Sequence, residues 1–241
     1  MESGRGRRPY VVASCAMSVD GLIDDASDRR LVLSNDADLD RVDQVRAECD
    51  AILVGAETVR RDNPRLLVRS ARRRRLRREE GRPDSPLKVT LTRSGDLDPA
   101  ARFFTEGGAE TLVYAASAAY TRTRDRLGSV TTVVDAGSSP EPDEVLADLW
   151  ARGVRRLLVE GGERVHTAFL TADLVDELHL VIAPCFVGHA DAPRFVGPGP
   201  FPHHPGRPMT LVEVRPIGDV ALLRYRLGSG RDAAAGDQAD R

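Results

Sequence analysis

Short apolar runs and segments of helical spacing alternate along most of this chain. Continuous apolar runs are typical of strands that are covered on both faces of a sheet. They predict strands at residues 10–17, 51–54, 87–92, 111–114, 130–134, 154–158 and 177–183. Apolar residues spaced three or four positions apart, often after a residue that can cap a first turn, predict helices. These are expected at 36–48, 58–62, 143–152 and around 168–170.

The end of the chain follows a different pattern. Two strands are expected at 209–214 and 220–226 with no helix between them, so we expect them to pair as an antiparallel edge. Elsewhere the alternation favours parallel strands. Neither a repeat nor a linker divides the chain. The pattern predicts a single α/β domain over 9–228 with a mixed, mostly parallel central sheet, flanked by disordered segments at 1–8 and 229–241.

Composition and charge narrow the classes of function. The chain has 241 residues and a formal net charge of −2, which gives no reason to expect a nucleic acid or an anionic membrane as a partner. The basic stretch at 69–82 has no interleaved aromatics, so a solvated loop is favoured over a nucleic-acid patch. No apolar run is long enough to span a bilayer. The three cysteines lack metal-ligand spacing and their odd number argues against a disulfide framework, so we expect a reduced, cytoplasmic protein without a metal site.

Polar turns follow four of the expected strands, at 18–21, 55–66, 92–95 and 160–162. In an open α/β sheet the carboxyl ends of parallel strands meet at one edge, where ligands bind. The pair Gly161-Gly162 before a helix offers backbone N–H groups at the positive end of a helix dipole. Arg93 and Ser94 can clamp a phosphate dianion. Together these turns suit a nucleotide with more than one phosphate group.

Each turn also has a purely structural interpretation. Thr58 could cap its helix, and Asp62 could hold the Asn-Pro turn that follows. Glu160 could cap the glycine turn or form an exposed ion pair with Arg155 or Arg156. The convergence of the turns on one edge is what favours a binding site.

Three stretches of the chain resemble a known family. They are SVDG from residue 18, RAECDAILVGAETVRRDNPRLLVR from residue 46 and LLVEGGERVHTAFLTADLVDELHLVIAPCFVG from residue 157. Together they are similar to the reductase domain of riboflavin biosynthesis, the 5-amino-6-(5-phosphoribosylamino)uracil reductase family, over about residues 10–227. The resemblance implies a dihydrofolate-reductase-like fold and a homodimer. It also implies that NADPH reduces a ribosylamino-pyrimidine phosphate, with hydride passing to ribose C1′ to give a ribityl chain.

The resemblance and the turns together assign roles to individual residues. The expected cofactor contacts are Ala16, Thr58, Asp62, Arg93, Ser94, Gly161, Gly162, Glu163, Arg164 and Val165. The expected substrate contacts are Ser18, Asp20, Arg46, Leu66, Arg69 and Glu160. Glu160 is a hypothetical substrate-orienting or proton-relaying group, and Asp62 is expected to order the ribose or nicotinamide end.

The chain also departs from the family pattern. The Ser-x-Trp that the family often has near Leu31 is missing, and Thr92-Arg93-Ser94 replaces its usual Asp-Ser. The zinc deaminase domain that is often fused to this family is not expected here. These departures leave the pyrimidine open between a uracil and a diaminopyrimidine. They also leave two alternatives: a paralogous reductase of a pterin, folate or specialised metabolite, and a non-catalytic nucleotide-binding module.

Overall fold

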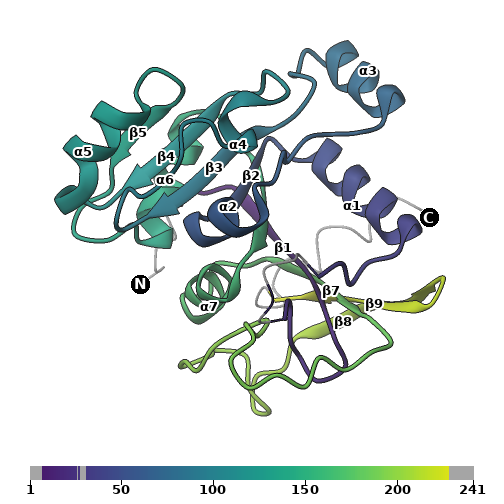
Figure 1. Cartoon of the computed structure of the whole chain (residues 1–241). Helices are drawn as coiled ribbons and strands as arrows, with labels where there is room; N and C mark the ends of the chain where they lie inside the picture. The colour runs from purple at the N-terminus through teal and green to yellow at the C-terminus, as the bar shows by residue number, and fades with distance from the viewer. Residues whose placement is uncertain (1–6, 26, 28–30, 228–241) are drawn as a thin grey trace.

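The computed structural model of the chain describes residues 7–25, 27 and 31–227, and these contain a single sheet between two layers of helices (Figure 1). The strands are β1 (Tyr10–Met17), β2 (Ala51–Gly55), β3 (Leu87–Thr92), β4 (Thr111–Ala115), β5 (Thr132–Asp135), β6 (Arg156–Gly161), β7 (Glu177–Ile182), β8 (Thr210–Ile217) and β9 (Val220–Arg226). The helices are α1 (Asp36–Glu48), α2 (Ala56–Asp62), α3 (Ala71–Glu79), α4 (Arg102–Thr105), α5 (Ser117–Leu127), α6 (Pro142–Ala151) and α7 (Glu163–Thr171).

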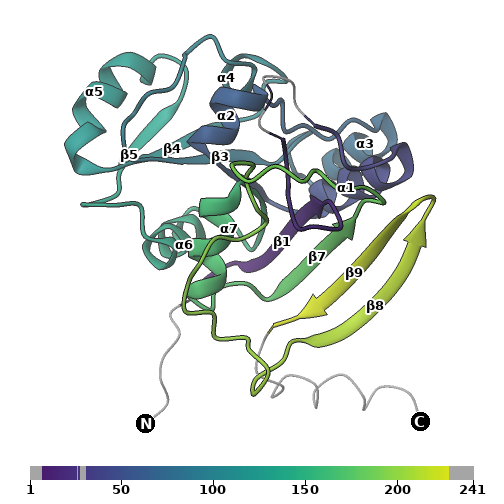
Figure 2. The ribbon, with the colours of Figure 1, turned by 60° about the horizontal axis from the view of Figure 1, so that its bottom comes forward.

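The sheet has the strand order β5-β4-β3-β2-β6-β1-β7-β9-β8. All pairs from β5 to β7 are parallel, whereas β9 runs antiparallel to both β7 and β8. The β8–β9 hairpin curves away from the rest of the sheet (Figure 2). This arrangement confirms the predicted mixed sheet with an antiparallel C-terminal edge.

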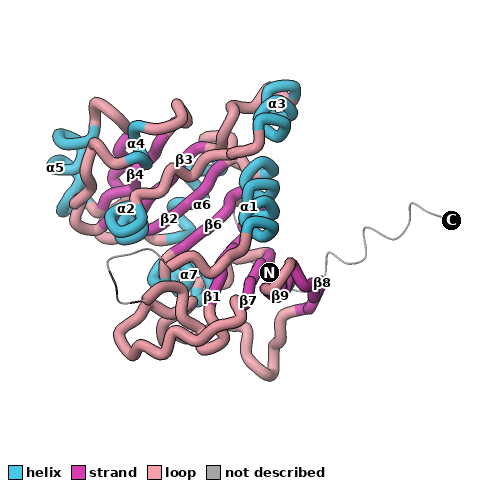
Figure 3. The backbone as a smooth tube through the Cα atoms, turned by 45° about the vertical axis from the view of Figure 1, so that its right-hand side comes forward, coloured by secondary structure: helices cyan, strands magenta, loops and turns pink. Residues whose placement is uncertain are grey.

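Successive residues of the central strands face opposite layers. Leu53 of β2 packs with residues of α6 and α7, whereas its neighbour Ile52 packs with residues of α1, α2 and α5. Both strand residues are fully buried. This is why the central strands are apolar at every position rather than at every second one. Figure 3 shows the helices on either side of the strands.

The basic stretch at 69–82 is not the solvated loop that the sequence favoured, because most of it forms α3. Arginine is a good helix former, and the Ser70 hydroxyl caps the helix by accepting from the Arg73 N–H. Arg77 is almost fully buried, and its guanidinium donates to the carbonyls of Ala47, Cys49 and Pro83. The helix is therefore held by tertiary contacts that composition does not reveal.

Sequence reasoning also missed α5, which buries only Ala119, Thr123 and Leu127 against the sheet. Two of these residues are small or polar, so the apolar signal is weak. At the start of the chain, the Arg8 guanidinium donates to the Asp176 carboxylate at 2.6 and 2.7 Å. Residue 8 is therefore tied to the domain, in contrast to the predicted disordered segment 1–8. The remainder of that segment up to residue 6, and the tail at 229–241, lie outside the described residues.

Candidate active site

A cavity of about 1000 Å³ lies at the carboxyl ends of the central parallel strands. Its wall includes the segments that follow β2, β3 and β6, together with the end of β1 and one face of α1. The structure therefore brings together three of the four polar turns that the sequence singled out. The sequence-selected residues in this wall are Ala16, Arg46, Thr58, Asp62, Arg93, Ser94, Glu160, Gly161, Gly162, Glu163, Arg164 and Val165.

The fourth turn, at residues 18–21 after β1, has a structural role. Ser18 is fully buried, and its hydroxyl donates to Asp20 at 2.5 Å and accepts from the Leu22 N–H at 3.0 Å. The Asp20 carboxylate also accepts from the N–H groups of Val187 and Gly188. These bonds, the one from Ser18 first, lower the pKa of Asp20 to about 2. The turn thus joins the end of β1 to the loop after β7, and Ser18 and Asp20 do not line the cavity.

Two consecutive glycines with positive φ connect β6 to α7. Gly161 has φ 98° and Gly162 has φ 88°, a region that residues with a side chain rarely adopt. The N–H groups of Val165 and His166 are the first to be taken up by the helix, since both donate to the Gly162 carbonyl. The N–H groups of Glu163 and Arg164 precede them at the positive end of the helix. The turn can therefore receive an anion directly on the backbone.

The two glycines are confined for different reasons. A side chain on Gly161 would collide with the ring of His166, whereas one on Gly162 would meet the Thr58 hydroxyl oxygen at 3.1 Å. His166 is fully buried and packs against Phe195, with ring centroids 5.2 Å apart. Burial lowers the pKa of His166 to about 4, so the ring is neutral near pH 7. The buried His166 ring packs against Gly161 and supports the turn, a role that the sequence did not indicate.

Three arginines whose side chains have no partner among the described residues share the cavity wall with this turn. The side chains of Arg93 after β3, Arg164 on α7 and Arg194 in a later loop line the cavity. None of the three forms a hydrogen bond or ion pair with a described residue. All three are exposed, so water solvates them without a ligand. This concentration of free positive charge beside a helix N-terminus forms a site for a polyanion.

Sequence reasoning missed Arg194 because it lies far along the chain in a loop without regular structure. The loop is fastened to α7 by two hydrogen bonds. The Arg194 N–H donates to the Glu163 carboxylate at 2.7 Å, and the Gly197 N–H donates to the Thr167 hydroxyl at 2.8 Å. Local sequence carries no signal for this placement, since the partners are about thirty residues apart.

The arginines of the α1 side are all partnered. Arg46 donates through Nε and Nη2 to the two carboxylate oxygens of Glu160, at 2.6 and 2.5 Å. Arg41 donates through Nε to Asp38 at 2.7 Å. The expected substrate contacts Arg46 and Glu160 are therefore paired with each other, in the bidentate geometry of a strong charge-assisted contact.

The structural interpretation of Glu160 as a surface partner of Arg155 or Arg156 is wrong. Arg155 stacks over the Trp150 ring at 3.8 Å, and Arg156 lies 3.9 Å from Glu177. Glu160 instead points to α1, and its side chain is only 13% exposed.

The segment after β2 contributes to both the cavity and the core. Thr58 donates weakly to the Gly161 carbonyl at 3.5 Å, which links α2 to the glycine turn. Asp62 ends α2 in the cavity wall. Leu66 has φ 49° and is 4% exposed, within the cluster that packs under α1 and α2. It does not line the cavity.

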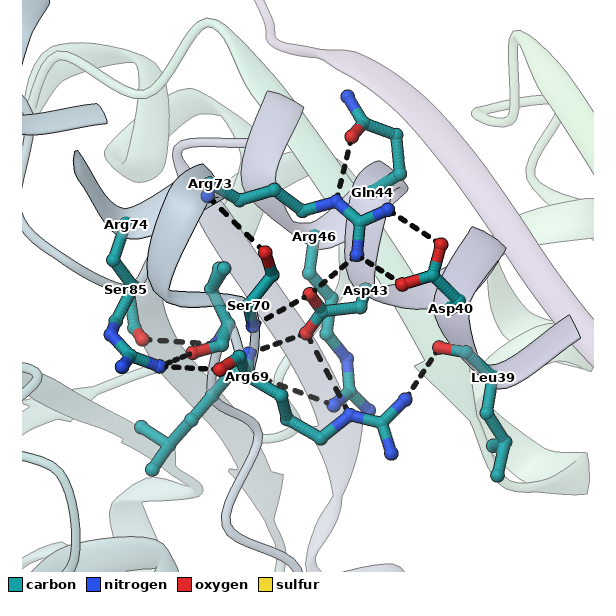
Figure 4. A network of polar contacts seen from close by, with 12 residues as sticks. Leu39, Asp40, Asp43, Gln44, Arg46, Arg69, Ser70, Arg73, Arg74 and Ser85 are labelled. Atoms are coloured by element: carbon teal, nitrogen blue, oxygen red, sulfur yellow. Dashed lines mark hydrogen bonds and ion pairs between the residues drawn. The ribbon is translucent and has the colours of Figure 1, made fainter. Parts of the chain in front are cut away.

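Arg69 lies outside the cavity wall, in a polar network between α1 and α3 (Figure 4). Asp43 of α1 is the centre of this network, because it accepts from the backbone N–H groups of Arg69 and Ser70 and from the Arg73 guanidinium. The Arg69 guanidinium donates to the Leu39 carbonyl at 2.6 Å, and Arg73 also reaches Asp40. The charges of the basic stretch thus hold α1 in place.

Neither a metal cluster nor a membrane-crossing segment is found in the part of the chain that the structure describes. No group of three or more His, Cys, Asp or Glu side chains there could hold a metal ion. None of the described helices combines the length and the apolar character that a bilayer span requires.

Comparison with known proteins places the chain in a family. Residues 9–223 match the RibD C-terminal domain. A 2,5-diamino-6-ribosylamino-4(3H)-pyrimidinone 5′-phosphate reductase from Archaeoglobus fulgidus is 36% identical over 186 residues, covering 77% of this chain and 85% of that protein. The protein of the same name from Methanothermobacter thermautotrophicus is 34% identical over 190 residues, covering 78% and 84%.

Solved structures share the fold. A pyrimidine reductase-like protein from Corynebacterium diphtheriae superposes with a TM-score of 0.74 at 24% identity, covering 90% of this chain and 91% of that one. Acinetobacter baumannii RibD superposes with a TM-score of 0.73 at 22% identity over 91% of this chain, which spans 58% of that longer protein. From the matched residues and these relatives, the chain belongs to the RibD C-terminal domain family, the reductases of riboflavin biosynthesis.

Proposed function

We propose that this protein uses NADPH to reduce a ribosylamino-pyrimidine 5′-phosphate to its ribitylamino product. The observation that carries the proposal is the group Arg93, Arg164 and Arg194, whose side chains have no hydrogen-bond or ion-pair partner among the described residues and share the cavity wall with the glycine turn. NADPH has three phosphate groups, and such a ligand needs cations that are not already engaged. A membership in the reductase family and the names of the similar archaeal proteins support the same substrate class.

The residues present fit this cofactor. Arg93 and Ser94, at the end of β3, would hold the 2′-phosphate of the adenosine. The glycine turn and the first N–H groups of α7 would hold the diphosphate, since a side chain at Gly162 would fill the approach. Ala16 and Asp62 line the cavity on either side of this turn, where we place the nicotinamide end. When bound, NADPH supplies the hydride for the reaction.

The substrate would lie against the α1 side of the cavity. In the reaction the C1′–O4′ bond of the ribose opens, the hydride adds to C1′ and O4′ takes up a proton. The partnered Arg46 and Glu160 would orient the ribose rather than supply strong acid catalysis, because both are already engaged in an ion pair. The protein would then accelerate the reaction mainly by holding the two reactants in line.

The decisive experiment measures NADPH oxidation by the purified protein with a panel of substrates. We expect oxidation with the diaminopyrimidinone or uracil ribosylamino 5′-phosphate, and none with a dihydropterin or dihydrofolate. Mass spectrometry of the product should show a gain of two hydrogens. Oxidation with the pterin alone would move the protein to the paralogous reductases. Tight NADPH binding without turnover on any substrate would favour the non-catalytic module.

The proposal includes a homodimer in a reducing compartment such as the cytoplasm. Cys15, Cys49 and Cys185 are all free thiols, which suits such a compartment. The apolar segment at 174–186 contains β7, and β7 is enclosed between β1 and β9. Four of the exposed large apolar side chains of the described residues are Phe186 and, on β8, Leu211, Val212 and Val214. Light scattering at micromolar concentration should give twice the monomer mass, and a monomer would contradict this part of the proposal.

A further inference from the structure

The α1 side of the cavity contains a buried carboxylate oxygen without a partner. Asp38 has no exposed surface, and its Oδ1 accepts from Arg41 Nε. Its Oδ2 is equally buried and meets no hydrogen-bond donor among the described residues, although Asp38 is part of the cavity wall. An unsatisfied buried acceptor of this kind destabilises the empty site. A donor on a bound ligand would remove that cost.

Arg41, one helical turn further along α1, is held from two sides and retains free donors. Its Nε lies on Asp38, and its Nη1 is 3.3 Å from His179 Nδ1 on β7. Because a guanidinium can only donate, His179 must accept through Nδ1 and carry its proton on Nε2. That proton is directed to Glu177 Oε1 at 2.9 Å. No described residue accepts a hydrogen bond from Arg41 Nη2. The cavity wall therefore presents a free donor on Arg41 beside the free acceptor on Asp38.

The charge of this region selects against a phosphate. Asp38 with Arg41 and Glu160 with Arg46 form two neutral pairs on the same wall. A phosphate dianion placed here would face two carboxylates and, among the described residues, no unpaired cation. An uncharged ring with alternating donors and acceptors fits better, since it can satisfy the Asp38 acceptor and the Arg41 donor without breaking an ion pair.

We propose that Asp38 and Arg41 read the edge of the substrate's pyrimidine ring and make the enzyme prefer a 2-amino-pyrimidinone over a uracil. Asp38 accepts from the 2-amino group and the adjacent N3–H, and Arg41 donates to the 4-carbonyl oxygen. A uracil presents a carbonyl oxygen in place of the 2-amino group, so two acceptors would face each other. A site built for a hydrogen bond discriminates strongly against a ligand that cannot form it. This inference rests on the proposed function and names the substrate within its class.

The test compares the two ribosylamino 5′-phosphates as substrates for the wild-type protein and for Asp38→Asn. Wild type should favour the 2-amino substrate by at least about 100-fold in kcat/KM, because a mispaired buried group costs about 3 kcal/mol. Asparagine keeps one acceptor and adds a donor, so Asp38→Asn should lower the rate on the 2-amino substrate and raise it on the uracil, narrowing or reversing the preference. A purely structural role of Asp38 would lower both rates by the same factor.

Two further variants complete the design. Arg41→Met should raise KM for both substrates by a similar factor, because both carry the 4-carbonyl. Asp40→Asn, on the same helix but outside the cavity wall, should leave the preference unchanged. Thermal unfolding shows whether each variant is folded. Should wild type reduce neither substrate, the proposed function fails; should it reduce either one while Asp38→Asn keeps the wild-type preference, this inference alone is overturned.

Discussion

The two walls of the cavity use arginine in opposite ways. On the wall formed by β3, α7 and the loop at 192–198, the arginine side chains form no hydrogen bond or ion pair with a described residue and are exposed to solvent. On the α1 wall each arginine lies on a carboxylate and is largely buried. A free cation can bind a phosphate without first giving up an ion pair, whereas a neutral pair is already ordered and can position an uncharged group. The cavity is therefore divided into a part suited to binding phosphate groups and a part suited to positioning an uncharged group.

The largest expected effect comes from breaking the pair on the α1 wall. Glu160→Gln keeps the shape but leaves the Arg46 guanidinium without a countercharge in a site where both side chains are under one-fifth exposed. Loss of one partner of a buried pair costs about 3–5 kcal/mol. We expect kcat to fall on the order of 100- to 1000-fold while the Kd for NADPH changes by less than about threefold.

Steady-state kinetics and a fluorescence titration of NADPH measure the two quantities separately. Glu79→Gln is the matched control, since it makes the same change in the exposed pair of Arg75 and Glu79 on α3. Such pairs contribute at most about 1 kcal/mol. Near-wild-type turnover of Glu160→Gln would show that the pair is structural and would remove Glu160 from the site.

Substitutions of the two glycines should affect different quantities, NADPH affinity for Gly162 and folding free energy for Gly161. Gly162→Val places a side chain at the start of α7, against the Thr58 hydroxyl, so we expect the Kd for NADPH to rise on the order of 100-fold in a folded protein. Gly161→Ala collides instead with the buried His166 and should cost about 2–5 kcal/mol of folding free energy. Circular dichroism and NADPH titration of both variants measure this. Unchanged NADPH affinity in a folded Gly162→Val protein would show that the turn only connects β6 to α7 and does not bind the cofactor.

A smaller effect is expected at the free-cation wall. Arg93→Ala should reduce the preference for NADPH over NADH by about tenfold to a hundredfold, the value of about 1.5–3 kcal/mol for a hydrogen bond to a charged group. The melting temperature should not change, because the Arg93 side chain forms no hydrogen bond or ion pair with a described residue. Arg72→Ala, an exposed arginine on α3 outside the cavity wall, is the control. Equal affinity of wild type for the two cofactors would contradict the assignment of the 2′-phosphate site.

The smallest expected effect is a pH dependence beneath the glycine turn. His166 has a pKa of about 4 in the folded protein, against about 6.5 when unfolded, so the unfolded state binds more protons between these values. Stability is therefore full above about pH 6.5 and falls as the pH drops toward 4. At about pH 5.5 the loss should be roughly 1.4 kcal/mol. Denaturant unfolding of wild type and His166→Leu measures the difference, and parallel pH profiles would exclude His166 as its source.

The sequence predicted the central sheet because strands buried on both faces are apolar throughout. It also predicted that the four polar turns would meet, since parallel strands place their carboxyl ends at one edge, and three of the four do. The helices α3 and α5 escaped prediction because their buried faces are small or polar. Arg77, for example, is buried while its guanidinium donates to three backbone carbonyls, and a pattern of apolar residues cannot indicate such a burial.

The sequence predicted turns that form the site, but it did not predict which side chains of the site would pair with each other. Arg46 and Glu160 were each selected, yet they are separated by 114 positions and nothing in either segment indicates that they meet. Arg194 lies in a loop whose position depends on bonds to α7. Asp38 and Arg41 do have a readable signal, the spacing of three residues that pairs opposite charges on a helix. It identifies a pair but gives no hint of the unsatisfied oxygen.

The position of β6 at the centre of the sheet has a consequence for synthesis on the ribosome. β6 lies between β2 and β1, although it follows β2 by about 100 residues and β1 by about 140. Until residues 156–161 leave the ribosome, β2 has one apolar edge open and β1 has neither of its final neighbours. Such late, long-range pairing slows folding and exposes strand edges to other chains. The nascent protein therefore completes its cavity only after most of its length has been made, and chaperones would have their greatest effect in that interval.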